Sequence, residues 1–150
     1  ARIVKALADR IDDSNRHFKP SLDGWTIEYH LAHIHHVRRY WLSELDEPAA
    51  LALEMALKDG WKELIVDLDA IKGMLDISAA AVRKGVLVAL EAGMENVGAY
   101  DNPVLYLQHM IWHEGWHVGL IVLALRMGGQ EPPEAWDEAN VWGQWRTEEG

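Results

Sequence analysis

Residues 102–129 read Asn-Pro-Val-Leu-Tyr-Leu-Gln-His-Met-Ile-Trp-His-Glu-Gly-Trp-His-Val-Gly-Leu-Ile-Val-Leu-Ala-Leu-Arg-Met-Gly-Gly. The Asn-Pro pair at 102–103 supplies an N-cap followed by proline at the first helical position, and the Gly-Gly pair at 128–129 is a helix stop. Between these signals the stretch is apolar nearly all round, which predicts a buried helix that ends near Met127. Two glycines one turn apart, Gly115 and Gly119, predict a close approach by a neighbouring helix.

The centre of this helix carries three histidines at four-residue spacing: His109, His113 and His117. Side chains four apart point the same way on a helix, with about 6 Å between their Cβ atoms. His113 and His117 could therefore hold one metal ion together. The same residues, with Glu114, also read as H-E-x-x-H, a metallopeptidase signature in which the glutamate is the general base.

Helical periodicity also marks most of the rest of the chain, and Thr26 and Asp67 stand where N-caps are expected. No stretch shows sustained apolar–polar alternation, so we expect no strand. Short connections between long helices favour an all-α helix bundle. The predicted helices cover residues 1–17, 27 to about 45, 49–58, 68–93 and 103–127, with room for a short one after residue 131.

The composition limits the possible metal ligands and the classes of partner. The 150 residues fit one domain, residues 1–150, and lack cysteine, so a metal site must use His, Asp, Glu or water. A net charge of −10 and the absence of a long apolar run disfavour nucleic acid and membrane partners. The basic pair Arg38-Arg39 reads as a solvated helix face. We expect a cytoplasmic protein that acts on a small molecule.

Two histidines on one helix are too few for a catalytic metal, which usually has three protein ligands and an open position. The helix after Thr26 offers His30, His33, His35 and His36. A helical wheel places His30 nearest the apolar stripe and His33 on its flank, with His35 and His36 facing solvent. Periodicity therefore slightly favours His30 over His33 as the third ligand.

The remaining polar groups have several interpretations. Glu114 could be a general base, could orient an imidazole, or could be a salt-bridged side chain. His109 lies to one side of the stripe and is expected to be structural, or to support a ligand from behind. His17 is expected at the surface.

Two motifs resemble a known family. Gly24-Trp25-Thr26-Ile27 followed by Leu31-Ala32-His33-Ile34 is similar to the second-helix motif of the DinB/YfiT superfamily, where a histidine follows the tryptophan by eight residues. The stretch 112–119, Trp-His-Glu-Gly-Trp-His-Val-Gly, resembles its fourth-helix motif. The tail from Gly128 to Trp145 is also similar. Leu120 departs from the pattern, because the family often has Gln there.

The resemblance implies an up-down-down-up four-helix bundle and a homodimer. It implies a divalent metal, usually zinc or nickel, held by His33, His113 and His117. His30 falls where the family usually has an aliphatic residue, and it stays an alternative ligand, or a residue behind the ligands, on the helical wheel alone. It also implies either a thiol S-transferase, with a low-molecular-weight thiol cosubstrate, or a hydrolase. Two rival hypotheses stay open: an H-E-x-x-H metallopeptidase, and a bundle without catalysis in which any metal is structural.

Overall fold

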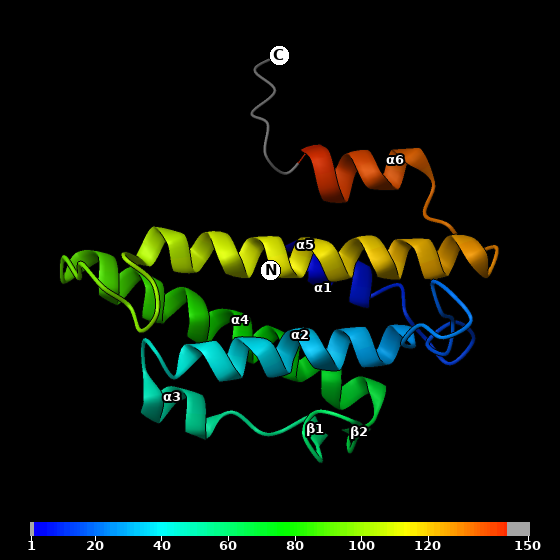
Figure 1. Cartoon of the computed structure of the whole chain (residues 1–150). Helices are drawn as coiled ribbons and strands as arrows, with labels where there is room; N and C mark the ends of the chain where they lie inside the picture. Colours follow the sequence, from blue (N-terminus) through cyan, green and yellow to red (C-terminus); the bar gives the residue numbers. More distant parts are fainter. Residues whose placement is uncertain (1, 144–150) are drawn as a thin grey trace.

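The computed structural model describes residues 2–143, and these are mostly helical, as predicted (Figure 1). The long helices α2, α4 and α5 pack against one another, and α1 packs on α4 and α5. A two-stranded antiparallel hairpin lies below α2 in Figure 1. In chain order the elements are α1 (Arg2–Ala8), α2 (Ile27–Leu42), α3 (Glu47–Ala52), β1 (Leu57–Lys58), β2 (Glu63–Leu64), α4 (Leu68–Glu91), α5 (Pro103–Met127), α6 (Glu134–Asp137) and the π-helix η1 (Glu138–Trp142).

The predicted N-caps set the start of each long helix. The Thr26 hydroxyl accepts a hydrogen bond from the Tyr29 amide at 3.3 Å, and the Asp67 carboxylate accepts one from the Ala70 amide at 2.8 Å. The Asn102 side chain accepts from two amides at the start of α5, each at 3.0 Å. These caps satisfy amides that have no partner inside the helix. They also fix where along each helix the later side chains fall.

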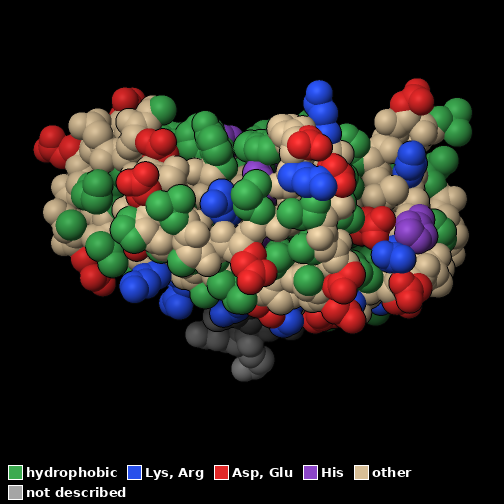
Figure 2. Space-filling view, turned by 90° about the horizontal axis from the view of Figure 1, so that it is seen from below, with side chains coloured by type: hydrophobic (Ala, Val, Ile, Leu, Met, Phe, Trp, Pro, Cys, Tyr) green, Lys and Arg blue, Asp and Glu red, His purple; other side chains and the backbone are tan. Residues whose placement is uncertain are grey.

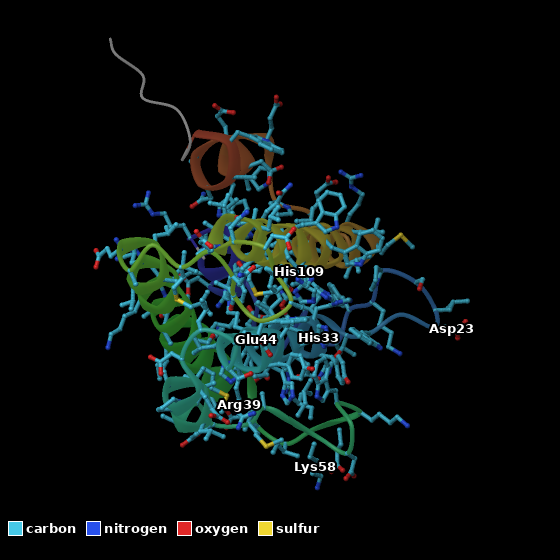
Figure 3. The ribbon with its side chains drawn as sticks, turned by 60° about the vertical axis from the view of Figure 1, so that its left-hand side comes forward. Asp23, His33, Arg39, Glu44, Lys58 and His109 are labelled. Atoms are coloured by element: carbon cyan, nitrogen blue, oxygen red, sulfur yellow. The ribbon has the colours of Figure 1, made fainter. Side chains whose placement is uncertain are left out.

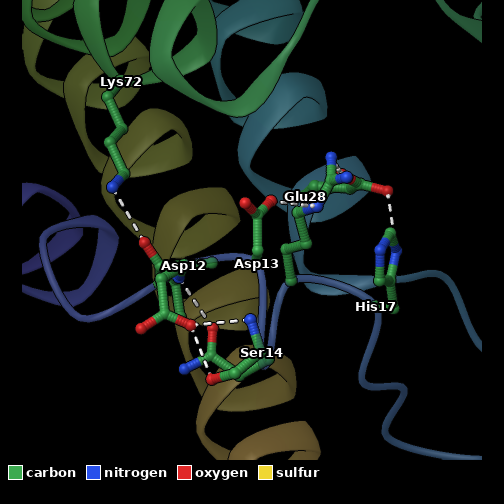
Figure 4. A network of polar contacts seen from close by, with 9 residues as sticks. Asp12, Asp13, Ser14, His17, Glu28 and Lys72 are labelled. Atoms are coloured by element: carbon green, nitrogen blue, oxygen red, sulfur yellow. Dashed lines mark hydrogen bonds and ion pairs between the residues drawn. The ribbon is translucent and has the colours of Figure 1, made fainter.

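The segment after α1 differs from the prediction of a helix over residues 1–17. The helix ends at Ala8, because side chains in the next turn bond to the backbone and replace helical hydrogen bonds. The Asp12 carboxylate accepts from the Ser14 amide at 2.8 Å, and Asn15 accepts from the Asp12 amide at 2.9 Å (Figure 4). Lys72 of α4 donates to the Ile11 carbonyl at 2.8 Å, which anchors this segment on the bundle.

The predicted helix over residues 49–58 is displaced, and the prediction of no strand is wrong. Asp46 caps α3 with Pro48 in its first turn, so the helix begins earlier, and it ends at Ala52. The chain then forms the β1–β2 hairpin, with Leu57 opposite Leu64. Strands of two residues are too short to leave an alternation pattern in the sequence.

Helix α5 is not buried all round. Ile111, Trp112 and Trp116 are 62%, 71% and 62% exposed. No atom lies within 4 Å of the place where a Cβ on Gly115 or Gly119 would stand, so the predicted close helix approach is absent within residues 2–143. The other side of α5 carries the buried residues Met110, His117 and Ile121.

Helix α4 buries one apolar face along most of its length. Leu68, Ile71 and Val86 are buried, but Leu90 near the end of the helix is 47% exposed. Short helical segments after residue 131 are confirmed, while Trp145 lies outside the described residues. None of the helices within residues 2–143 has the length and apolar character needed to cross a membrane.

Substitutions at two glycines, one at the end of α5 and one inside α4, test the packing at the end of α5. A Cβ on Gly128 would overlap the Phe18 ring, so Gly128→Ala should lower the free energy of unfolding by about 1–3 kcal/mol. Gly73 is an exposed position inside α4 with open space around it, so Gly73→Ala should raise it by about 0.5–1 kcal/mol. Urea denaturation measures both, and equal effects of the two substitutions would contradict the packing at Phe18.

Candidate metal centre

Three histidines from two helices converge between α2 and α5. The Nε2 atom of His113 lies 3.3 Å from Nε2 of His33 and 3.2 Å from Nε2 of His117. The three rings offer nitrogens that all lie within 4.8 Å of one another, so the group could hold a metal ion. Figure 3 labels His33 at α2 and His109 near α5.

The spacings suit a metal ligand set. Imidazole nitrogens that bind zinc at about 2.0–2.1 Å in a tetrahedral arrangement lie roughly 3.3–3.4 Å apart. The two measured separations, 3.2 and 3.3 Å, are close to that edge length. Each neutral ring has one lone pair to offer, and the Nε2 atoms of His33 and His117 both lie within 3.3 Å of Nε2 of His113. The donor set therefore fits a divalent cation.

His30 is not one of the three converging histidines, but it contacts His117 from the other side of that ring. Its Nδ1 atom lies 2.9 Å from Nδ1 of His117, so one ring donates and the other accepts. If His117 presents the lone pair of Nε2 to a cation, its Nδ1 carries the hydrogen and donates to His30. His30 then fixes the tautomer and the orientation of His117. The wheel was right that His30 is buried, but His33 occupies the position beside His113.

The prediction that His35 and His36 face solvent is wrong. They are 1% and 3% exposed, because α4 and the segment after α3 cover this side of α2. The His35 nitrogens lie 3.0 Å from the Met74 carbonyl and 2.9 Å from the Glu54 carbonyl. The ring of His36 packs edge-on against Trp61, with centroids 4.8 Å apart. Both histidines thus anchor α2 to its neighbours.

Arg38 is also buried, at 2% exposed, which corrects the prediction of a solvated basic pair. Its Nε donates to the Glu114 carboxylate at 2.7 Å and its Nη1 donates to the Leu75 carbonyl at 2.8 Å. Burial raises the pKa of the Glu114 carboxyl, but the hydrogen bond and charge of Arg38 act against this, and the net pKa is lowered. Of the three interpretations of Glu114, this geometry favours the salt-bridged side chain.

His109 lies beside the group rather than in it. Its Nδ1 forms a hydrogen bond with the Tyr100 hydroxyl, and its ring packs edge-on against Trp41 with centroids 5.4 Å apart. The His109 and His113 ring centroids are 6.5 Å apart. This placement agrees with the expected structural role.

Trp25 forms a wall over the histidines. Its only predicted role was as part of the family motif at the start of α2. Its ring is nearly parallel to that of His117, with 4° between the planes and centroids 6.1 Å apart, and it lies 5.1 Å from the His33 ring. One cavity of about 410 Å³ and another of about 370 Å³ both border Trp25 and His33. His33 can therefore be reached from two cavities.

The apolar surroundings keep these imidazoles neutral. Burial, together with smaller effects of the nearby His113, His36 and His30, lowers the pKa of His33 to about 4. Burial also lowers the pKa of His117 to about 3, with the charges of His113, His33 and His30 adding to the effect. Neutral rings have lone pairs free for a cation near pH 7.

These pKa shifts predict how the metal-free protein responds to acid. The histidines have lower pKa values folded than unfolded, so between pH 6.5 and 4.5 the unfolded chain binds more protons. The free energy of unfolding should therefore be greatest above pH 6.5 and fall by about 2–4 kcal/mol as the pH drops to 4.5. Urea denaturation after chelation measures this. His117→Gln should make this fall smaller, because one histidine with a lowered pKa is removed, and a flat profile in the unaltered protein would contradict the shifts.

Comparison with known proteins adds no assignment. No protein-family model, no curated protein and no solved structure matches this chain. The function must therefore be argued from the residues and their geometry.

Proposed function

We propose that this chain is a DinB-like metal-dependent enzyme that acts on a small molecule. The observation that carries the proposal is the convergence of His33, His113 and His117 in a site bordered by two cavities. The tryptophan–threonine start of α2 and the histidine pair on α5 support the resemblance. Packing of α1 on α4 and α5, and of α2 on the same two helices, is compatible with an up-down-down-up four-helix bundle.

The three histidines would hold a divalent cation, with zinc or nickel as the expected metals. A bound cation supplies positive charge that favours ionisation of a thiol or of water near neutral pH. The chain's own residues prepare the site. His30 orients His117, burial keeps the imidazoles neutral, and the Trp25 ring stacks on that of His117.

Two cavities that share His33 favour a reaction of two small molecules over hydrolysis of one. Each cavity lies within the range of small-molecule sites, about 300–1,000 Å³. A low-molecular-weight thiol in one cavity could meet an electrophile in the other. The sulfur would form a bond to the electrophilic carbon, the carbon–halogen bond would break, halide would leave, and the thiol proton would pass to solvent.

The metallopeptidase alternative has less support. Its general base would be Glu114, whose carboxylate is engaged with the buried Arg38. Peptidases of this class align substrate along a strand edge, and the hairpin strands have two residues each. Chelation distinguishes the non-catalytic bundle from the metal-dependent enzyme, because the enzyme must lose turnover when the metal is removed.

Histidine substitutions test the ligand set. His33→Ala, His113→Ala and His117→Ala should each remove most of the bound metal, because two imidazoles hold a catalytic ion poorly. His30→Ala should weaken metal affinity about 10- to 100-fold, as expected for loss of a partner behind a ligand. Elemental analysis after dialysis against dilute zinc measures all four variants.

Two further variants serve as controls for this series. His17→Ala, at an exposed side chain, should keep full occupancy. Glu114→Gln should keep the metal yet destabilise the fold by about 3–5 kcal/mol, because it leaves the Arg38 charge buried. Occupancy that survives His33→Ala but collapses in His30→Ala would contradict the proposed ligands.

Turnover separates transfer from hydrolysis. The zinc-loaded protein should conjugate small thiols to a chloronitroarene, with release of chloride that stops on chelation. Ester or amide hydrolysis without any use of the thiol would support the hydrolase instead. If the protein shows neither activity and its melting temperature does not change on chelation, the non-catalytic bundle is the remaining hypothesis.

The proposal includes a homodimer. The exposed apolar side chains Ile111, Trp112 and Trp116 line α5, and the open space above Gly115 and Gly119 would admit a partner helix. Sedimentation should give a dimer at micromolar concentration, and Trp112→Glu should give a monomer. Ile77→Glu, at a 60% exposed position on α4, is the matched control and should stay dimeric. A monomeric unaltered protein would remove the dimer from the proposal.

A further inference from the structure

The turn of the β1–β2 hairpin forms one wall of the larger cavity. Asp59, Gly60 and Trp61 all have positive φ, of 50°, 65° and 70°. Such a conformation is unfavourable for a bulky side chain, and residues held this way cluster at ligand-binding sites. Trp61 is kept in place because the Tyr29 hydroxyl donates to its carbonyl oxygen.

Trp61 is held against the histidine site. Its ring packs edge-on with His33 at 5.6 Å between centroids and with His36 at 4.8 Å. Trp25 borders the same cavity from the start of α2, with its ring 5.1 Å from that of His33. The cavity of about 410 Å³ is lined by Trp25, Tyr29, His33, Gly60, Trp61 and Lys62. A flat apolar group suits such aromatic walls.

Lys62 is the lysine of this lining, which holds no carboxylate. Within residues 2–143 no carboxylate lies within ion-pair distance of Lys62, whereas Lys58 on the same hairpin is paired with Glu63 at 3.0 Å. Acidic and basic side chains are interspersed on the face that carries the hairpin (Figure 2). The Lys62 ammonium is thus available to a ligand's negative group.

We infer that this cavity binds the aromatic ring of a substrate that carries a carboxylate or similar anionic group. The ring packs against Trp25 and Trp61, and the anionic group pairs with Lys62 at the rim. This inference rests on the proposed function, because it directs the rest of the substrate toward His33. Trp61 and Lys62 are then the residues that determine which electrophile is accepted.

Benzoate and benzyl alcohol are a matched pair of probes that differ in charge. Calorimetric titration of the zinc-treated protein should show benzoate binding roughly three- to tenfold tighter than benzyl alcohol. Lys62→Met should abolish that preference, and Lys58→Met, which alters a lysine already paired, should keep it. Preference retained in Lys62→Met would overturn the inference, since the carboxylate would then bind elsewhere.

The position of the ring is tested with a second pair. Trp61→Asn should weaken both probes about tenfold, and asparagine tolerates the positive φ, so the turn can persist. Trp116 lines the smaller cavity and not this one, so Trp116→Leu should change neither affinity more than twofold. Greater loss in Trp116→Leu than in Trp61→Asn would overturn the inference by placing the ring in the other cavity. Melting curves establish that each variant is folded at the assay temperature.

Metal content measured on the same samples separates this inference from the proposed function. Bound zinc without a Lys62-dependent preference for benzoate contradicts the anion site alone. A Lys62-dependent preference in protein that takes up no zinc supports the anion site and contradicts the metal-dependent enzyme.

Discussion

Several imidazoles lie buried side by side between α2 and α5, and they must be neutral to be stable there. A charged histidine here would lose its hydration and would face other histidines, so the rings are driven toward the neutral form. The Nε2 atoms have one another as neighbours, at 3.3 Å between His33 and His113 and 3.2 Å between His113 and His117, and each neutral ring offers one lone pair. A cation would satisfy all three at once, which links the stability of this region to the proposed metal.

The rest of the fold positions these rings. The Thr26 cap sets the start of α2 and therefore the position of His33 along that helix. Asn102 and Pro103 set the start of α5 and therefore the positions of His113 and His117 along it. The buried pair of Arg38 and Glu114 joins the same two helices on another side. Breaking such a pair leaves an uncompensated charge, so it also resists sliding of α2 along α5. Two helix starts and one ion pair thus control the geometry of the site.

Much of this arrangement could be predicted from local patterns. The caps at Thr26, Asp67 and Asn102, the extents of α4 and α5, and the His113–His117 pair all follow from short-range spacing. The choice of His33 over His30 did not, because both positions lie near the apolar side of α2 and periodicity ranks them only by distance from its centre. The resemblance of the Trp25-to-His33 motif gave the residue that the structure brings beside His113.

The errors have a common physical origin in elements without a periodic signal. The helical wheel placed His35 and His36 away from the apolar stripe, and Arg38 was taken as part of a solvated face, but α4 and the segment 53–64 cover that side of α2 and supply carbonyl or ring partners. The hairpin is held by tertiary contacts such as Tyr29 with Trp61, which leave no trace in a window of sequence. The exposure of Trp112 and Trp116 was missed for the opposite reason, since apolar residues all round a helix were taken to mean burial.

The central claim is that His33, His113 and His117 bind one metal ion together. Diffraction from crystals grown with zinc, measured on both sides of the zinc absorption edge, tests it most directly. The account predicts one strong anomalous peak between α2 and α5, within bonding distance of the Nε2 atoms of all three histidines. A peak held by other side chains, or ordered rings of these three histidines with no peak between them, would contradict it.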